Sequence, residues 1–222
     1  MIQVRPAIPR AQLSSLVRFP TAFLFFAIAF WSAPALPARA AAPSNPVNGV
    51  PSEKPEEFLR RSLDQLLHLA TAHPTDDPRA LAKTVRPAFE KIFNFESLTR
   101  KSLGIAWREL SPPQQTQAVT LFSELVIRSY TTRFDPHSKL EVDFTRSSNL
   151  GDGKMEVPAI AKHQGNSVSV AYRVESTPRG WVVYDAIIEG VSLTQNYRAQ
   201  FDEIRQRNSS AHILRAMEEK LK

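Results

Sequence analysis

Residues 181–201, WVVYDAIIEGVSLTQNYRAQF, constrain the fold more than any other stretch of the chain. The first eight are mainly β-branched or aromatic on both alternating faces, which is typical of a strand covered on both sides. Gly190 ends this run, and a serine or threonine just after it can cap a helix. Tyr197 and Phe201 lie four residues apart, so both rings face the same way along that helix. A long apolar strand therefore turns into a helix whose aromatic side chains fold back over it, forming either a solid core or a lined cavity.

The N-terminal residues 1–40 have the three parts of a secretory signal peptide. Three arginines form a basic region, an apolar run of thirteen residues covers 19–31, and Ala38-Arg39-Ala40 is an A-x-A cleavage site. The apolar run is shorter than the roughly 20 residues of a bilayer span, and no cysteine follows it that could carry a lipid anchor. We expect residues 1–40 to be a cleaved signal peptide, with an uncleaved anchor as the alternative. Residues 41–55 are predicted to be a flexible linker, and 56–222 a single domain.

The charge balance changes once this segment is set aside. The whole chain has 28 basic and 22 acidic residues, but four of the basic ones and none of the acidic ones lie in residues 1–40. The remaining 24 basic residues nearly balance the 22 acidic ones, so overall basicity gives no reason to expect a nucleic-acid partner. Because the chain has no cysteine, the exported domain must be held together by packing, without disulfides.

Apolar residues at helical spacing predict that the first part of the domain is helical. Helices are expected at about 56–72, 78–93, 95–103 and 112–133, around Tyr197 and Phe201, and at 211–221. Asp77-Pro78 and Ser111-Pro112 are helix starts, the second with the Gln of a capping box. Pro87 lies inside the second helix, where a kink or a break is expected.

After Asp135-Pro136 the spacing of the apolar residues changes from 3.6 to 2, which predicts strands. Four strands are expected, at about 140–145, 155–161, 167–174 and 181–188, joined by short glycine-containing turns. Pro158 indicates an edge or a bulge in the second of them. Strands that follow one another through short turns form an antiparallel meander, and helices before and after it give an α+β fold.

Signals of catalysis are few. The chain has no G-x-S-x-G, H-E-x-x-H, P-loop or Rossmann glycine pattern, and its five histidines lack metal-ligand spacing, so no metal or cofactor is expected. Asp185 interrupts an apolar strand, and a buried carboxylate there could act as a general base. The alternative is that it pairs with Arg173 or Arg198 and holds the junction of strand and helix, which we favour because no second acid or nucleophile accompanies it.

Aromatic residues are numerous on the faces predicted to point inward. The chain has 13 Phe, 3 Trp and 4 Tyr, of which five Phe and one Trp belong to the predicted signal peptide. Aromatic stripes more often form a filled core than a ligand site. Periodicity does not distinguish a filled core from a hollow one.

Most of the domain, from about Asp76 to Leu221, resembles the MlaC family, also called toluene-tolerance auxiliary proteins. The most specific motifs are Tyr184-Asp185, Glu189-Gly190-Val191-Ser192-Leu193, Asn196-Tyr197-Arg198 and Gln200-Phe201. Supporting motifs are Phe93-Asn94-Phe95-Glu96, Ser102-Leu103-Gly104, Trp107-Arg108 and Pro113-Gln114-Gln115.

The resemblance implies helices and a twisted sheet around an apolar cavity that holds acyl chains, with the lipid headgroup in solvent. It implies a monomeric periplasmic carrier, not an enzyme, that moves phospholipid between the two membranes of a diderm bacterium. On that basis the candidates for the cavity wall are Phe93, Phe95, Trp107, Phe122, Val126, Tyr130, Val170, Tyr172, Trp181, Val183, Ile187, Tyr197 and Phe201.

The implied partners are an inner-membrane ABC transporter, through its MlaD-type ring, and an outer-membrane lipoprotein–porin complex. A related branch is associated with hopanoids, so a hopanoid-like lipid is an alternative cargo. Two other classes stay open: a cavity-containing α+β enzyme that uses Asp185, and a periplasmic adaptor with a filled core.

Overall fold

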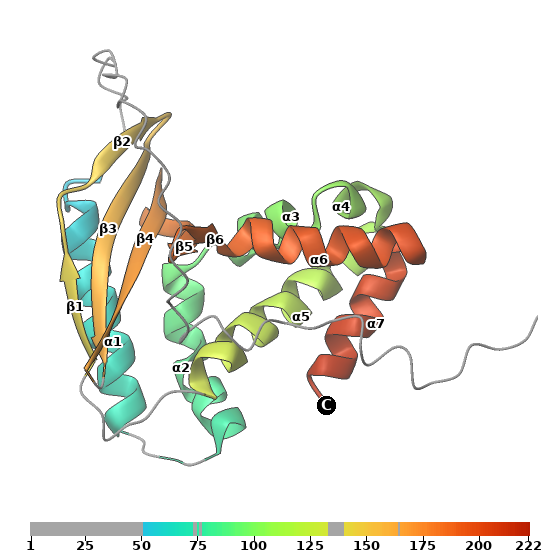
Figure 1. The fold of residues 1–222 in the computed structure, drawn as a ribbon, viewed down its shortest axis with the longest axis horizontal. Helices are drawn as coiled ribbons and strands as arrows, with labels where there is room; N and C mark the ends of the chain where they lie inside the picture. The colour runs from blue at the N-terminus through green and yellow to red at the C-terminus, as the bar shows by residue number, and fades with distance from the viewer. Residues whose placement is uncertain (1–50, 73–74, 76, 133–139, 164) are drawn as a thin grey trace, which may run out of the picture.

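The computed structural model describes residues 51–72, 75, 77–132, 140–163 and 165–222, so the predicted signal peptide and most of the linker lie outside the described residues. The described residues form the α+β fold predicted from the sequence (Figure 1). The helices are α1 Pro55–Ala72, α2 Pro78–Ile92, α3 Phe95–Leu103, α4 Ile105–Glu109, α5 Pro112–Thr131, α6 Leu193–Arg207 and α7 Ser210–Lys220. The strands are β1 Leu140–Phe144, β2 Ser148–Gly151, β3 Lys154–His163, β4 Asn166–Thr177, β5 Gly180–Ile188 and β6 Val191–Ser192.

The sheet is antiparallel, in the order β1-β3-β4-β5-β6, with β2 also paired to β3. The four predicted strands are present, but two more, β2 and β6, were missed because they are too short for periodicity to reveal them. Pro158 lies in the middle of β3, opposite the gap between β1 and β2. A proline can occupy this position because no neighbouring strand there needs its missing N–H.

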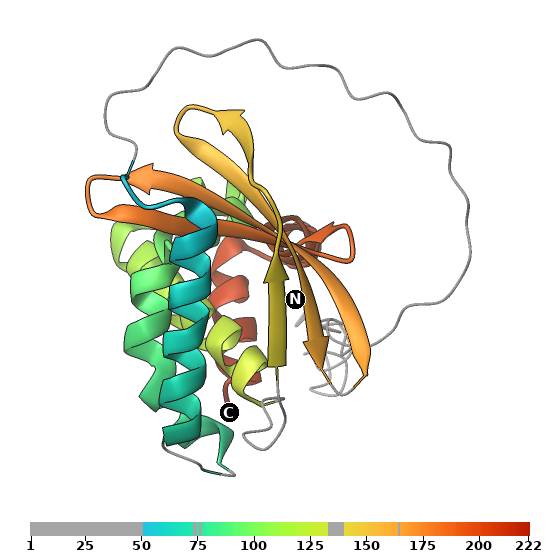
Figure 2. The same ribbon diagram turned by 90° about the vertical axis from the view of Figure 1, so that its left-hand side faces the viewer.

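Two groups of helices lie against different parts of this sheet. Helix α1 lies against β1 and β3 and α2 lies against β5, whereas α3, α5, α6 and α7 form a helical body beyond β5 and β6 (Figures 1 and 2). The chain between α2 and α3 runs alongside β5, where the Asn94 amide donates to the Val183 carbonyl at 2.9 Å. This contact joins the helical body to the sheet.

Local signals explain most helix ends. The Asp77 carboxylate accepts from the Arg79 amide at 2.9 Å at the start of α2, and the Ser111 amide donates to the Gln114 side chain at 2.9 Å at the start of α5. The predicted break near Pro87 is wrong: α2 is continuous through it. A proline removes only one helical hydrogen bond, and the buried apolar face of α2 holds the helix on both sides of it.

The apolar residues form two cores. In the helical body, the rings of Phe122, Tyr197 and Phe201 pack together, with centroids 4.9 Å apart for Phe122–Tyr197 and 6.0 Å for Phe122–Phe201. The second core, between the sheet and the first two helices, contains Phe58, Leu59, Ile92, Val157, Val174, Trp181 and Val183. Leu66 and Phe93 pack against both cores, so the two cores adjoin one another.

Gly104 separates α3 from α4 and needs to be a glycine for two reasons. Its φ of +54° is rarely adopted by other residues. A Cβ at this position would also lie 2.8 Å from the Nε atom of Arg198 on α6. The Arg198 side chain would therefore have to move to accommodate any larger residue at this position.

Candidate functional site

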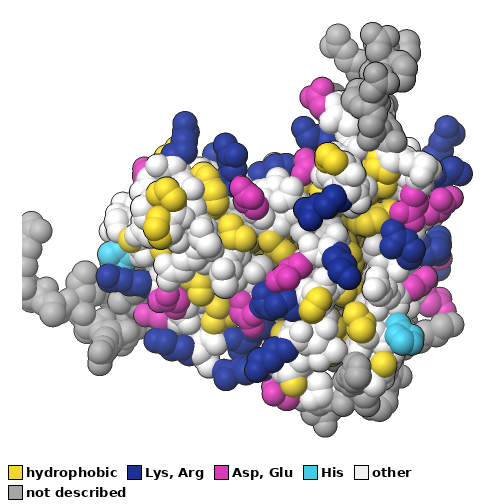
Figure 3. Space-filling model, turned by 180° about the vertical axis from the view of Figure 1, so that it is seen from behind, with side chains coloured by type: hydrophobic (Ala, Val, Ile, Leu, Met, Phe, Trp, Pro, Cys, Tyr) yellow, Lys and Arg dark blue, Asp and Glu magenta, His cyan; other side chains and the backbone are white. Residues whose placement is uncertain are grey.

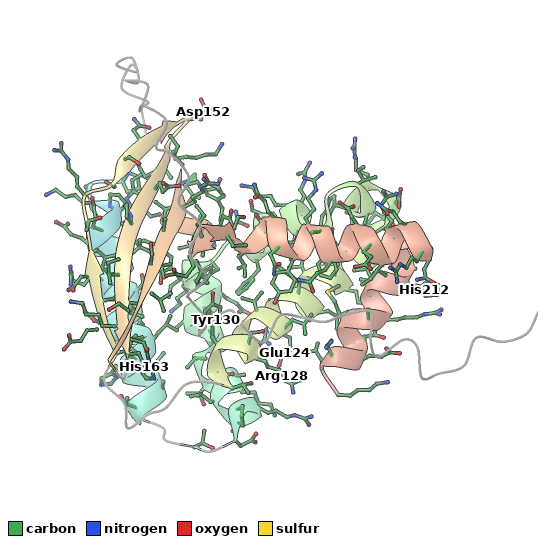
Figure 4. All side chains as sticks on the ribbon, viewed as in Figure 1. Glu124, Arg128, Tyr130, Asp152, His163 and His212 are labelled. Atoms are coloured by element: carbon green, nitrogen blue, oxygen red, sulfur yellow. The ribbon has the colours of Figure 1, made fainter. Side chains whose placement is uncertain are left out.

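A cavity of about 400 Å³ lies between α1, α2, the C-terminal end of α5 and one face of the sheet. Residues of both apolar cores contribute to its wall, among them Leu81 and Phe89 of the first core and Leu59 and Ile92 of the second. Its wall is mainly aliphatic, with leucines from α1 and valines from β1, β4 and β5. Figure 4 shows Tyr130 on α5 and His163 at the end of β3, which are two of the lining residues.

The wall carries no Asp, Glu, Lys or Arg side chain within the described residues. Its polar members are Ser62, Tyr130, Thr131, Tyr172, His163 and Asn166. A wall of this kind has no group that would bind a charged ligand strongly, and it favours an apolar one.

Two tyrosines mark how dry the cavity wall is. Burial raises the pKa of Tyr172 to about 12. Burial also raises the pKa of Tyr130, with a smaller contribution from the neighbouring Tyr172. Both phenols are therefore neutral at physiological pH.

Twelve of the thirteen residues proposed from the sequence as the cavity wall fall into three groups. Five of them line the cavity: Phe93, Tyr130, Val170, Tyr172 and Val183. Six belong to the helical core or pack on it: Phe95, Trp107, Phe122, Val126, Tyr197 and Phe201. Trp181 lies in the core beside the sheet, where its indole N–H donates to the Glu53 carbonyl at 2.8 Å.

The thirteenth residue, Ile187, is turned away from the cavity by a β-bulge. Strand β5 has one extra residue relative to β4 between Val183 and Asp185, because Val174 pairs with Val183 but Arg173 pairs with Asp185. A bulge of this kind shifts the alternation of side chains by one residue. Val183 lines the cavity before the bulge, and Ile188, not Ile187, lines it afterwards.

The wall also contains many residues that sequence reasoning did not select. Helices α1 and α2 supply Leu59, Leu63, Leu66, Leu67, Ala70, Leu81, Val85, Phe89 and Ile92, and the sheet supplies Leu140, Val142, Phe144, Ala161, Val168, Ala186 and Ile188. The stripe of apolar residues on α1 was visible in the sequence. It was passed over because the candidates were chosen largely for being aromatic.

Asp185 is buried at the junction of β5 and α6, and its carboxylate is fully engaged. The Ser192 hydroxyl donates to Oδ2 at 2.7 Å, and the Thr194 and Ala186 amides donate to Oδ1 at 3.1 and 2.9 Å. The guanidinium of Arg173 lies 3.9 Å from Oδ2. These contacts connect the end of β5 to the start of α6. Asp185 is not among the residues that line the cavity.

The described residues offer no other obvious site. No group of three or more His, Asp or Glu side chains among them could hold a metal ion. No helix in the described part of the chain is long and apolar enough to cross a membrane. The face of the molecule in Figure 3 carries Lys and Arg side chains mixed with Asp and Glu, with no large area of one sign.

Comparisons with known proteins agree with this picture. One solved structure that resembles the chain is the phospholipid-binding protein from Ralstonia solanacearum in complex with a phospholipid. It is 24% identical, with a TM-score of 0.67, and the alignment covers 72% of this chain and 93% of the other. No curated protein matches the chain. The family model of the MlaC protein matches residues 60–219, which is more than two thirds of the 222 residues; the chain belongs to the MlaC family.

Proposed function

We propose that this protein is a lipid carrier that holds the acyl part of a phospholipid in the cavity between α1, α2 and the sheet. The observation that carries the proposal is the apolar, uncharged wall around a space of about 400 Å³. Ligand pockets range from about 300 to 1,000 Å³, so this space suits acyl chains with the headgroup left outside. Membership of the MlaC family and the phospholipid in the similar Ralstonia structure support the same assignment.

The energetics of lipid transfer explain why such a carrier needs a cavity. Each CH₂ group removed from water contributes about 0.8 kcal/mol, so a chain of roughly 16 carbons contributes on the order of 12 kcal/mol. A lipid with exposed tails would therefore leave a membrane very slowly. A wall without charged groups binds the acyl chain of the lipid but does not bind its headgroup strongly. This suits a carrier that must also release its cargo.

The place of action follows from the predicted export signal and from the family. The carrier works in the periplasm after cleavage of residues 1–40. Its partners there are the MlaD-type ring of an inner-membrane ABC transporter and an outer-membrane lipoprotein–porin complex, between which it shuttles lipid. It acts as a monomer.

The enzyme that would use Asp185 is not favoured by any contact of the described residues. Its carboxylate already accepts three hydrogen bonds and lies next to Arg173. The filled-core adaptor is not favoured either, because the cavity is present. A hopanoid-like cargo would fit the same apolar wall, so the test must identify the lipid.

The test is native mass spectrometry of the mature protein purified from a periplasmic extract, followed by lipid extraction. We expect a stoichiometric adduct with the mass of a phospholipid. An adduct with the mass of a triterpenoid would assign the cargo to the hopanoid class. A protein that stays free of lipid after incubation with vesicles would contradict the proposal.

Neighbouring residues of β4 provide matched variants. Val170 lines the cavity, whereas Ala171 does not and alternates to the other face of the sheet. Val170→Glu should abolish lipid retention, because it places an unpaired charge in the apolar wall, and Ala171→Glu should retain the lipid. Val168→Glu, at a half-buried position of the same wall, serves if Val170→Glu does not fold. A folded wall variant that keeps its lipid would contradict the assignment of the site.

A further inference from the structure

Besides the hydroxyl group of Thr131, three others interrupt the apolar wall of the cavity. They belong to Ser62 on α1, Tyr130 on α5 and Tyr172 on β4, so they come from three separate elements around the same space. Ser62 is only 4% exposed. Within the described residues, no hydrogen bond joins any of the three hydroxyls to another protein group.

Other buried hydroxyls near the cavity do have partners. The Thr131 hydroxyl, on the same wall, donates to the Pro78 carbonyl at 3.3 Å. Tyr197, in the adjacent core, is hydrogen-bonded to Ser129. The Ser192 hydroxyl donates to Asp185. These three hydroxyl groups therefore differ from the partnered ones in that they face an apolar space without a protein acceptor or donor among the described residues.

Both phenols lie on the wall of the same cavity, one on α5 and one on β4. Burial raises the pKa of Tyr130 and of Tyr172, and Tyr172 itself adds to the rise for Tyr130. No hydrogen bond contributes to either shift. Both groups are therefore neutral O–H donors in an apolar space, and an acceptor brought by a ligand would satisfy them.

We infer that the hydroxyls of Tyr130, Tyr172 and Ser62 form a polar subsite inside the cavity that binds an ester carbonyl oxygen of the carried lipid. An ester carbonyl is an acceptor without a donor, which complements hydroxyl donors, and it is small enough to enter with the acyl chain. The inference rests on the proposed function. It adds that the cavity distinguishes lipids by their linkage as well as by their apolar chains.

The test compares two phospholipids with the same headgroup and chain length, one with ester-linked acyl chains and one with ether-linked alkyl chains. An equimolar mixture in vesicles competes for the lipid-free protein, and native mass spectrometry measures the ratio of the two complexes. We expect the wild-type protein to favour the ester lipid by about fivefold, as one net hydrogen bond would give. Tyr130→Phe and Tyr172→Phe should each lower this ratio towards one while still binding both lipids.

Tyr184→Phe is the matched control. Tyr184 is also a buried tyrosine, but its ring lies under the Lys101 ammonium and does not line the cavity. It should leave the ratio unchanged. If the wild-type protein binds both lipids equally, the polar subsite is refuted while the carrier function stands. If it binds neither, the proposed function itself is refuted.

Discussion

Replacing Asp185 should reveal whether this buried carboxylate holds the fold together. In Asp185→Ala, the Ser192 hydroxyl and the Thr194 amide lose their acceptor, and Arg173 loses its buried partner. The loss falls where β5 turns into α6, so it weakens the connection between the sheet and the helical body. We therefore expect the variant to fold but to be clearly less stable.

The magnitude follows from the contacts. Removing one partner of a buried ionic network costs about 3–5 kcal/mol, because the groups left behind stay desolvated. Asp185→Asn keeps an acceptor for the Thr194 and Ala186 amides but loses the charge beside Arg173, which is one third exposed and partly screened. Its cost should be about 1–2 kcal/mol.

Urea unfolding followed by circular dichroism measures both values. With a slope of about 2 kcal/mol per molar urea, Asp185→Ala should lower the midpoint by about 1.5–2.5 M. The control is Asp143→Ala, which removes an exposed carboxylate paired with Lys162 at 2.8 Å and should leave the midpoint unchanged. An unchanged or raised midpoint for Asp185→Ala would refute this reasoning and would make a catalytic role for the carboxylate the better explanation.

Three further predictions concern the scaffold and the cavity wall. Gly104→Ala should lower the free energy of unfolding by about 1–3 kcal/mol because of its positive φ, and it should also displace the Arg198 side chain. Gly190 has a φ of +79° with open space around it, so Gly190→Ala should carry only the cost of the positive φ. Comparison of the urea midpoints of the two variants checks this difference. Phe122 is fully buried against Tyr197 and Phe201, so Phe122→Ala should lower the free energy of unfolding by about 3–5 kcal/mol. Val191 is 46% exposed, and Val191→Ala should leave this free energy almost unchanged. The pKa of Tyr172 is raised from 10.0 to about 12 in the folded protein. As the pH rises, the unfolded state therefore loses this proton first. The contribution of Tyr172 to the stability should be fully present below pH 10 and be lost between pH 10 and 12. Tyr172→Phe should reduce that fall, and an identical pH profile for wild type and variant would contradict the assigned burial.

The order of the elements could be predicted from the sequence because local signals agree with the fold. The change of apolar period near residue 140 places the helices and the four main strands correctly. Asp77 and Ser111 mark helix starts that the structure confirms. Strands β2 and β6 could not be found this way, because two to four residues give no periodicity.

The cavity wall could be predicted only in part, for two physical reasons. The bulge between Val183 and Asp185 shifts the alternation of side chains along β5, and no local sequence signal predicts it. Strict alternation therefore points to Ile187, whereas Ile188 is the residue that lines the cavity. Aromatic rings are also the best fillers of a closed core. Phe122, Tyr197 and Phe201 fill the helical core, and the hollow is left to aliphatic residues of α1, α2 and the sheet.

Some residues of the cavity wall belong to neither packed core, and this has a consequence for how the protein can evolve. A wall residue already borders empty space, so shortening it removes some apolar surface but creates no new void in a packed region, and the cost is smaller than in a core. Leu63, Leu67 and Val142 line the cavity but belong to neither core, so they can change in size with little effect on folding. Drift at such positions can adjust the length and shape of the lipid chain that fits, while Phe122 and Phe201 keep the scaffold constant.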